Sequence, residues 1–184
     1  MLIPDIVRNI SDLEQILLLQ QKNLKEHLSA DERKSQGFLT LSHSLEILHA
    51  MHSMAPSIVI RDQDTVVAYA LTEMPACRHL MPGLEPMFEL IDTLDYKGRP
   101  LSSYLYYTMG QICVDEAYRG QGLFDLLYQH HRQIFAPTYQ LLLTEISTSN
   151  TRSLQAHRRV GFGELCIHRD DLDEWSLVVW DWMG

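Results

Sequence analysis

Gly110-Gln-Ile-Cys-Val-Asp-Glu-Ala-Tyr-Arg-Gly-Gln-Gly-Leu-Phe124 joins a predicted strand to a predicted helix through a glycine turn. The β-branched residues Ile112 and Val114 favour a strand, and the polar residues after them end it. Two glycines then make a tight turn, and an apolar helix begins at Leu123. A helix N-terminus exposes unpaired N–H groups and carries a partial positive charge, so this turn is a candidate anion site. Glycine lets the backbone approach a phosphate closely, and Arg119 adds a cation beside it.

The turn departs from two common phosphate-binding patterns. A dinucleotide fingerprint requires a third glycine where this chain has Asp125, and a P-loop requires a Gly-Lys-Ser/Thr ending that is missing here. The turn resembles instead the coenzyme A pyrophosphate loop of the GNAT N-acetyltransferases, whose pattern is Arg/Gln-x-x-Gly-x-Gly/Ala. Arg119 and Gly122 fit this pattern, and Phe124 stands where that family usually has Gly or Ala.

A second segment, Asn150-Thr-Arg-Ser-Leu-Gln-Ala-His-Arg-Arg-Val-Gly-Phe162, extends the resemblance, because the family also has an Asn, a short helix and Gly-Phe at this distance. The resemblance implies acetyl-CoA as co-substrate without a metal. It implies an α/β fold, with a mixed, mostly antiparallel central sheet flanked by helices on both faces. It also implies cofactor contacts from Ile112, Cys113, Val114, Arg119, Gly120, Gln121, Gly122, Leu123, Phe124, Asn150 and Ser153.

Transfer of an acetyl group from a thioester to an amine requires an acid for the leaving thiolate. The family commonly places a Tyr seven residues after the Asn, and this chain has His157 there. An imidazole has an N–H to donate, and its unperturbed pKa of about 6.5 is within a few units of a thiol's roughly 8.5. His157 is therefore either the general acid or a residue packed beneath the cofactor arm. For Cys113 we expect an apolar strand role and no acyl-cysteine.

The reaction also requires a base for the amine. Glu145 ends an apolar strand, twelve residues before His157. It resembles the glutamate of the ribosomal-protein N-terminal acetyltransferases, a GNAT branch with a Leu-Glu-Val-x-x-x-Asn strand end. A carboxylate needs a raised pKa or a water relay to deprotonate an ammonium. The alternative for Glu145 is a structural hydrogen-bond acceptor, and Glu73, at another strand end, is the second candidate base.

The composition of the chain limits the kinds of partner that it can have. The 184 residues, 46% hydrophobic and 21% charged, predict one domain over 1–184. No apolar run reaches the ~18–20 residues of a membrane span and no signal pattern opens the chain, so we expect a cytoplasmic protein without membrane contact. The net charge of −9 argues against nucleic acid as a partner. The three cysteines form no paired framework, and His49 and His52, at i and i+3, lack a third metal ligand.

Hydrophobic periodicity predicts the remaining elements. Ser11 to Leu28 is predicted as a helix with a Ser11–Glu14 capping box, and Ser29 to Gln36 as a turn with a loose helical piece. Further along, we expect a hairpin of two strands at 57–74, a strand at 104–114, a helix from 123, a strand at 139–146, a helix at 150–160, and an antiparallel pair at 165–168 and 175–180. Residues 75–103 are predicted as an insertion over the active site. Its carboxylates either favour a cationic acceptor or only solvate a helix face.

The sequence thus predicts an N-acetyltransferase that passes an acetyl group from acetyl-CoA to a primary amine by direct attack. The acceptor, a small molecule or a peptide, is left open. The alternative is a protein of the same fold that binds acyl-CoA without turnover, as a sensor or interaction partner. A homodimer through the last strands would suit Trp175, Trp180 and Trp182, and a core role suits them equally.

Overall fold

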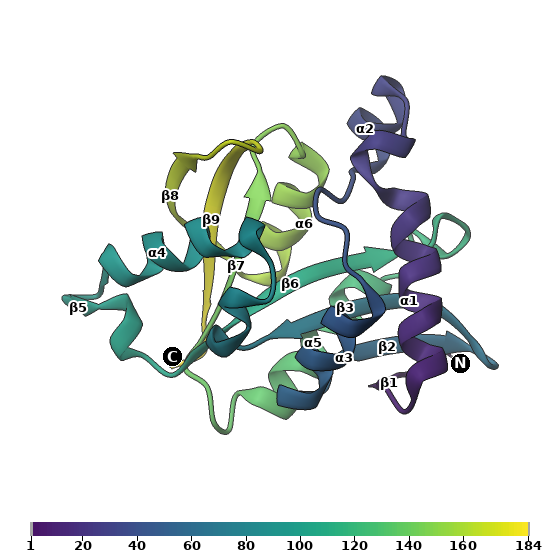
Figure 1. Ribbon diagram of the computed structural model, residues 1–184, viewed down its shortest axis with the longest axis horizontal. Helices are drawn as coiled ribbons and strands as arrows, with labels where there is room; N and C mark the ends of the chain where they lie inside the picture. Colours follow the sequence, from purple (N-terminus) through teal and green to yellow (C-terminus); the bar gives the residue numbers. More distant parts are fainter. Residues whose placement is uncertain (1, 184) are drawn as a thin grey trace.

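The computed structural model describes residues 2–183, which form one seven-stranded sheet with helices on both faces (Figure 1). The strands are β1 (Pro4–Ile6), β2 (Ile58–Asp62), β3 (Thr65–Glu73), β6 (Tyr106–Val114), β7 (Leu141–Ser147), β8 (Gly163–Arg169) and β9 (Glu174–Asp181). Their order is β1-β2-β3-β6-β7-β9-β8, and all neighbours are antiparallel except β6 and β7. The predicted mixed, mostly antiparallel sheet is confirmed.

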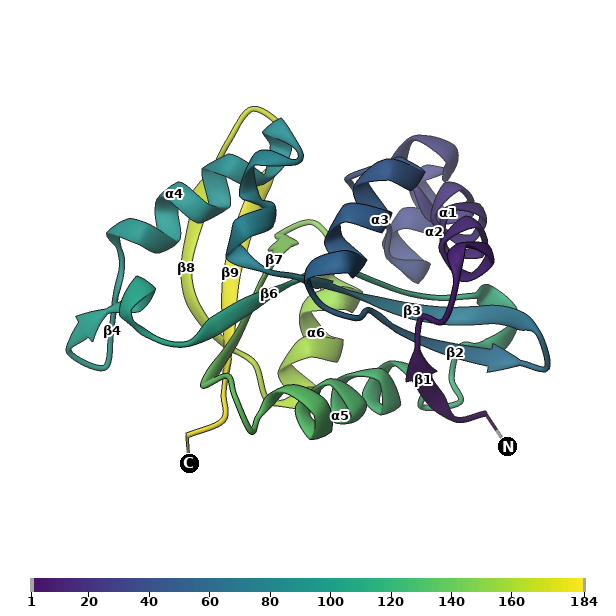
Figure 2. The same cartoon turned by 60° about the horizontal axis from the view of Figure 1, so that its bottom comes forward.

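The helices are α1 (Ile10–Asn23), α2 (Ala30–Gln36), α3 (Leu45–Met54), α4 (Glu85–Thr93), α5 (Leu123–Phe135) and α6 (Thr151–Val160). Helices α5 and α6 lie on one face of the sheet, and the other four lie on the opposite face (Figure 2). The core forms where their apolar faces meet the strands. Helix α5, for example, buries Leu127 and Tyr128 completely. Each such side chain contributes roughly 1.5–3 kcal/mol on leaving water.

Strands β6 and β7 pair over only three residues, from Tyr106 opposite Leu141 to Thr108 opposite Leu143. Beyond that point β6 continues against β3, and β7 continues against β9. The β3–β6 register shifts at Gly110, which has no partner on β3 and is a bulge residue. A bulge bends its strand. The bend carries β6 away from β7, and a gap opens between the two strands.

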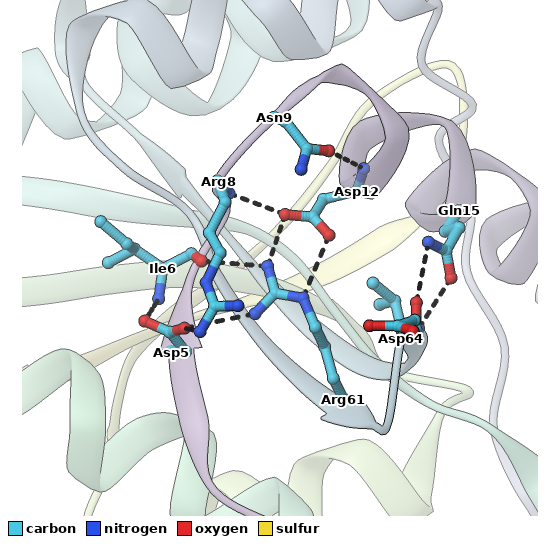
Figure 3. Close-up of polar contacts among 9 residues, drawn as sticks. Asp5, Ile6, Arg8, Asn9, Asp12, Gln15, Arg61 and Asp64 are labelled. Carbon is cyan, nitrogen blue, oxygen red and sulfur yellow. Dashed lines mark hydrogen bonds and ion pairs between the residues drawn. The ribbon is translucent and has the colours of Figure 1, made fainter.

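The start of α1 differs from the prediction. Asn9 is the N-cap, and its side chain accepts a hydrogen bond from the Asp12 N–H at 3.1 Å (Figure 3). The predicted Ser11–Glu14 capping box is therefore wrong, and the helix ends at Asn23. Asp12 is buried and forms an ion pair with Arg61 on β2. Burial disfavours its charge, but the hydrogen bonds from Arg61 and the Arg8 N–H outweigh burial and lower the pKa of Asp12.

Residues 30–36 form a complete helix where a turn with a loose helical piece was predicted. Ser29 caps α2 in a capping box, in which Glu32 Oε2 accepts from the Ser29 N–H at 2.8 Å. The Ser-x-x-Glu signature of this box is present in the sequence. Helix α2 is short and has no buried residue, so no hydrophobic periodicity marked it.

The segment 75–103 forms α4 and a small hairpin of β4 (Asp95–Tyr96) and β5 (Arg99–Pro100). Helix α4 packs its apolar face over β7 and β9. Two carboxylates of this segment, Glu85 and Asp92, pair locally with Arg78, at 3.0 Å and 2.9 Å. These two groups therefore serve the segment itself.

Candidate functional site

The gap between β6 and β7 opens into a cavity of about 770 Å³. Its walls are the end of β6, the turn at 119–122, the first turns of α5 and α6, and the segment 34–39. Ten of the eleven predicted cofactor residues line it; Gln121 does not. The sequence analysis missed the opposite wall, which includes Asn23, Lys34, Gln36, Gly37 and Phe38. Only the N-terminal segment's path across the sheet brings these residues to the turn.

The glycine turn has the geometry of an anion site. Gly120 and Gly122 have φ angles of +76° and +78°, which glycine adopts without strain. No atom lies within 4 Å of a Cβ placed on either glycine, so the turn leaves room for a ligand. Helix α5 begins at Leu123 without a side-chain cap, and its first N–H groups remain free to donate. A phosphate at this helix end would accept from them.

Arg119 is held by hydrogen bonds within the protein. Its guanidinium donates to Val114 O at 3.1 Å, to Asn23 Oδ1 at 2.6 Å and to Gln36 Oε1. The side chain therefore ties the end of β6 to α1 and α2, in addition to placing a positive charge at the cavity wall. Arg152, which donates to Ser35 O at 2.8 Å, lies at the same wall.

Asn150 joins α6 to the segment that roofs the cavity. Its Oδ1 accepts from the Ser153 N–H at 3.2 Å and so caps α6, while its Nδ2 donates to Phe38 O at 3.0 Å. A Cβ on Gly37 would lie only 3.0 Å from Asn150 Oδ1, so this close approach and the φ of +76° both require glycine.

His157 lies beneath the cavity with both ring nitrogens engaged. Nδ1 is 2.8 Å from Ser153 O, which can only accept, so this nitrogen carries the proton. Nε2 then accepts from the Tyr128 hydroxyl at 2.6 Å. Burial lowers the pKa of His157 to about 4, so the ring is neutral at pH 7. Because neither nitrogen offers a free N–H, this geometry favours packing beneath the cofactor arm over the general-acid role.

A smaller cavity of about 110 Å³ adjoins the first, and the two share Phe38, Ile112, Asn150 and other residues. Glu73 and Glu145 line it from β3 and β7, on opposite sides of the gap. Apolar side chains, among them Leu41, Leu84, Met87, Met109 and Trp175, form one part of its wall, and polar ones such as Gln111, Thr144 and His157 form the other. Two carboxyl groups therefore face one small space whose walls are partly apolar and partly polar.

Glu145 is paired with His168, a residue that the sequence analysis did not single out. The Glu145 carboxyl and His168 Nε2 are in hydrogen-bond contact, and both side chains are largely buried. Burial raises the pKa of Glu145 to about 8, and the negative charges of Asp170 and Glu73 add to the increase. A register shift on β8, between Glu164 and Cys166, sets which β8 residue reaches Glu145. No sequence pattern marks this shift.

Within residues 2–183, no helix is long and apolar enough to cross a membrane. Over the same residues, no cluster of three or more His, Cys, Asp or Glu side chains is placed to hold a metal ion.

Comparison with known proteins finds likeness in structure and none in sequence: no family model matches the chain, and no curated protein does. The structure resembles the ribosomal-protein-S18-alanine N-acetyltransferase from Escherichia coli, with a TM-score of 0.65 and 15% identity, over 98% of this chain and 94% of that one. It equally resembles a chain of the NatC complex bound to Gag peptide and CoA, with a TM-score of 0.65 and 11% identity, over 98% of each chain.

A third similar structure is yncA from Salmonella typhimurium, which was solved with its cofactor acetyl-CoA. It has a TM-score of 0.62 and 13% identity, over 100% of this chain and 95% of that one. At these identities the likeness concerns the fold alone, and it extends over nearly the whole of each chain.

Proposed function

We propose that this protein, whose chain has the GNAT N-acetyltransferase fold predicted from its sequence, is an N-acetyltransferase that passes an acetyl group from acetyl-CoA to a primary amine. The observation that supports this most is the gap between β6 and β7. It joins the glycine turn at one end to two buried carboxyl groups at the other. A phosphate site and a proton acceptor are thus linked by an open strand edge, as direct transfer requires.

The turn and the strand edge would hold acetyl-CoA, whose thioester supplies the acetyl group. The N–H groups at the start of α5 receive the pyrophosphate. Along β6, the Asp115 N–H donates to Val67 O on β3, and hydrogen bonding alternates along an antiparallel strand. The N–H groups of Ile112 and Val114 therefore face the gap, and that of Cys113 faces β3. Ile112 and Val114 hold the extended thiol arm, and Cys113 contributes its side chain.

Glu145 would accept the proton that the acceptor ammonium loses. Its raised pKa brings it nearer to that of an ammonium, which makes the transfer less unfavourable. The neutral amine then attacks the thioester carbon, the C–N bond forms as the C–S bond breaks, and the surplus proton of the acylated nitrogen passes to the leaving thiolate. His157 supports the floor of the cavity without donating that proton.

Titration calorimetry with acetyl-CoA tests the cofactor site, with Gly122→Ala as the variant and Gly98→Ala as its control. Both glycines have φ near +80° and open space at the Cβ position, and only Gly122 lines the cavity. Both variants carry the same strain of about 1 kcal/mol. We expect Gly122→Ala to weaken binding about tenfold or more, and Gly98→Ala to bind as the wild type. Absence of acetyl-CoA binding to the wild type would overturn the proposed cofactor.

Acetyl transfer to a panel of primary amines and peptides, followed by thiol release, tests the reaction. We expect Glu145→Gln to lower kcat/KM roughly 100-fold or more, because a general base contributes that much, while acetyl-CoA affinity stays unchanged. Full activity in this variant would remove Glu145 from the mechanism.

One observation favours the second candidate, an acyl-CoA-binding protein without turnover. The position that commonly supplies the general acid in the resembled family holds His157, which has no free N–H. If the wild type binds acetyl-CoA and releases no thiol with any amine of the panel, the binding protein is the better description.

A further inference from the structure

Glu73 is a buried carboxyl group with one oxygen that has no partner. The side chain ends β3 and is fully inaccessible to solvent. Its Oε2 lies 2.6 Å from the Thr108 hydroxyl, whereas its Oε1 has no hydrogen-bond partner within residues 2–183. An unsatisfied buried polar atom costs about 1–3 kcal/mol, so its retention calls for an explanation.

A purely structural role explains Glu73 poorly. A glutamine would keep the contact with Thr108 at the same size and would avoid the penalty of burying an ionisable group. Burial raises the pKa of Glu73 to about 7, with the Thr108 hydrogen bond opposing the increase, so the group destabilises the fold at neutral pH. Buried acids of this kind concentrate where proteins bind or transform ligands.

The surroundings of Glu73 indicate what it would bind. Glu73 lines the cavity of about 110 Å³ that also receives Glu145, and Gly110, the bulge residue of β6, lies against it. Glu145 is already in contact with His168, whereas Oε1 of Glu73 is a hydrogen-bond acceptor without a donor among residues 2–183. A partner must therefore bring an N–H donor and, to pair with an ionised carboxylate, a positive charge.

The lining of the cavity restricts that partner further. Leu41, Leu84 and Met109 would contact the carbon atoms next to the charged group. A primary ammonium on an apolar stem fits this description.

We propose that Glu73 binds the ammonium group of the acceptor amine through its free Oε1 and holds it opposite Glu145. This role rests on the proposed acetyl transfer and divides the work between two carboxylates: Glu73 recognises the ammonium, and Glu145 takes the proton. The acceptor is then a primary amine whose nitrogen is borne on an apolar carbon.

Binding of small probes tests this assignment without a known acceptor. The backbone amide signals of Gly110 and Thr108 are followed by NMR while n-propylammonium, n-propanol or tetramethylammonium is added. The alcohol has the shape without the charge, and tetramethylammonium has the charge without an N–H. We expect only n-propylammonium to shift these signals in a saturable way, and its affinity to fall about tenfold or more in Glu73→Gln. In Glu145→Gln the loss should stay below about threefold.

Two results would overturn the assignment. One is that n-propylammonium binds Glu73→Gln as tightly as it binds the wild type, and the other is that n-propanol binds the wild type as tightly as n-propylammonium does. The second comparison needs no variant and holds even if Glu73→Gln folds poorly. An unchanged acetyl-CoA affinity in Glu73→Gln verifies its fold. Because acetyl-CoA binding is measured separately, loss of the ammonium site and loss of the cofactor site are distinguishable.

Discussion

At the scale of single residues, His168 shows how a site can depend on a side chain outside its cavities. The imidazole contacts Glu145, so it influences the proton affinity of the proposed base. If the neutral ring donates its Nε2–H to the carboxylate, it stabilises the ionised form. Removing that donor would raise the pKa of Glu145 further, above the value of about 8 that burial and neighbouring charges give it.

We therefore expect His168→Leu to move the acidic limb of the pH profile of kcat/KM to higher pH. Activity requires ionised Glu145, and loss of the donor disfavours ionisation. His168→Gln retains an N–H donor and should keep the limb near the wild-type position. Profiles from pH 6 to 10 measure the difference. Identical limbs in wild type and His168→Leu would show that the pair has no influence on the base.

The burial of Glu73 predicts how the free energy of unfolding changes with pH. The pKa of Glu73 is about 7 in the folded protein against 4.5 as the reference. A raised acid pKa leaves stability intact below the unfolded value and lowers it as pH rises from about 4.5 to about 7. Glu73→Gln removes this loss, which at about 1.4 kcal/mol per pKa unit amounts to roughly 3 kcal/mol at pH 8. Urea denaturation at pH 4.5 and pH 8 should show a gain for the variant at pH 8 only.

At the scale of elements, two asparagines cap helices in the same way and differ in what else they touch. Asn9 caps α1 and Asn150 caps α6, and only Asn150 also donates to Phe38 O at the cavity roof. Replacing either residue by alanine should lower the free energy of unfolding by about 1 kcal/mol through loss of the cap. Only Asn150→Ala should also weaken acetyl-CoA binding. Equal affinities in the two variants would mean that the roof does not contribute to the cofactor site.

Several elements could be read from the sequence because each carries a local signal. The glycine turn, the helix from Leu123 and the closing strand pair follow from turn residues and hydrophobic periodicity, and each is present. The cap of α1 was misplaced, because Ser11 and Glu14 fit the capping pattern as well as Asn9 does. Helix α2 was only partly predicted, because it buries no apolar face.

The site was less predictable than the elements. The predicted cofactor residues from Ile112 to Phe124 lie on one continuous piece of chain, so they could be named together. The contact of Glu145 with His168 depends on a register shift, and the ties of Arg119 to Asn23 and Gln36 depend on how distant segments cross. Such pairings arise from tertiary packing, which one sequence does not display.

At the scale of the whole molecule, buried titratable groups limit stability from both sides of neutrality. Burial lowers the pKa of His43 and His157 to about 4 and of His131 to about 3. Unfolding lets these rings take up protons below about pH 6.5, so stability falls as the medium becomes acidic. Glu73 and Glu145 act in the opposite direction, because their raised pKa values make stability fall as pH rises toward 8.

We expect the free energy of unfolding to peak between about pH 6 and 7. Below about pH 6.5 the three histidines make it rise with pH more steeply than the two glutamates make it fall, and above that pH only the glutamates act. Urea denaturation from pH 4 to 9 measures the curve. The double variant Glu73→Gln with Glu145→Gln should flatten its alkaline side and steepen the rise between about pH 4.5 and 6.5, where the glutamates of the wild type oppose the histidines. Stability that kept rising to pH 9 in the wild type would contradict this account.

The parting of β6 from β7 has a thermodynamic consequence. Only three residue pairs join the two halves of the sheet, so β7 does not pair with β6 at Ile112 and Val114, and the backbone N–H groups of these two residues face the gap. An extended thiol arm that accepts hydrogen bonds from these N–H groups would take the place of a neighbouring strand. A ligand that binds only the folded state stabilises that state by mass action. The protein's melting temperature would then report the concentration of its own co-substrate.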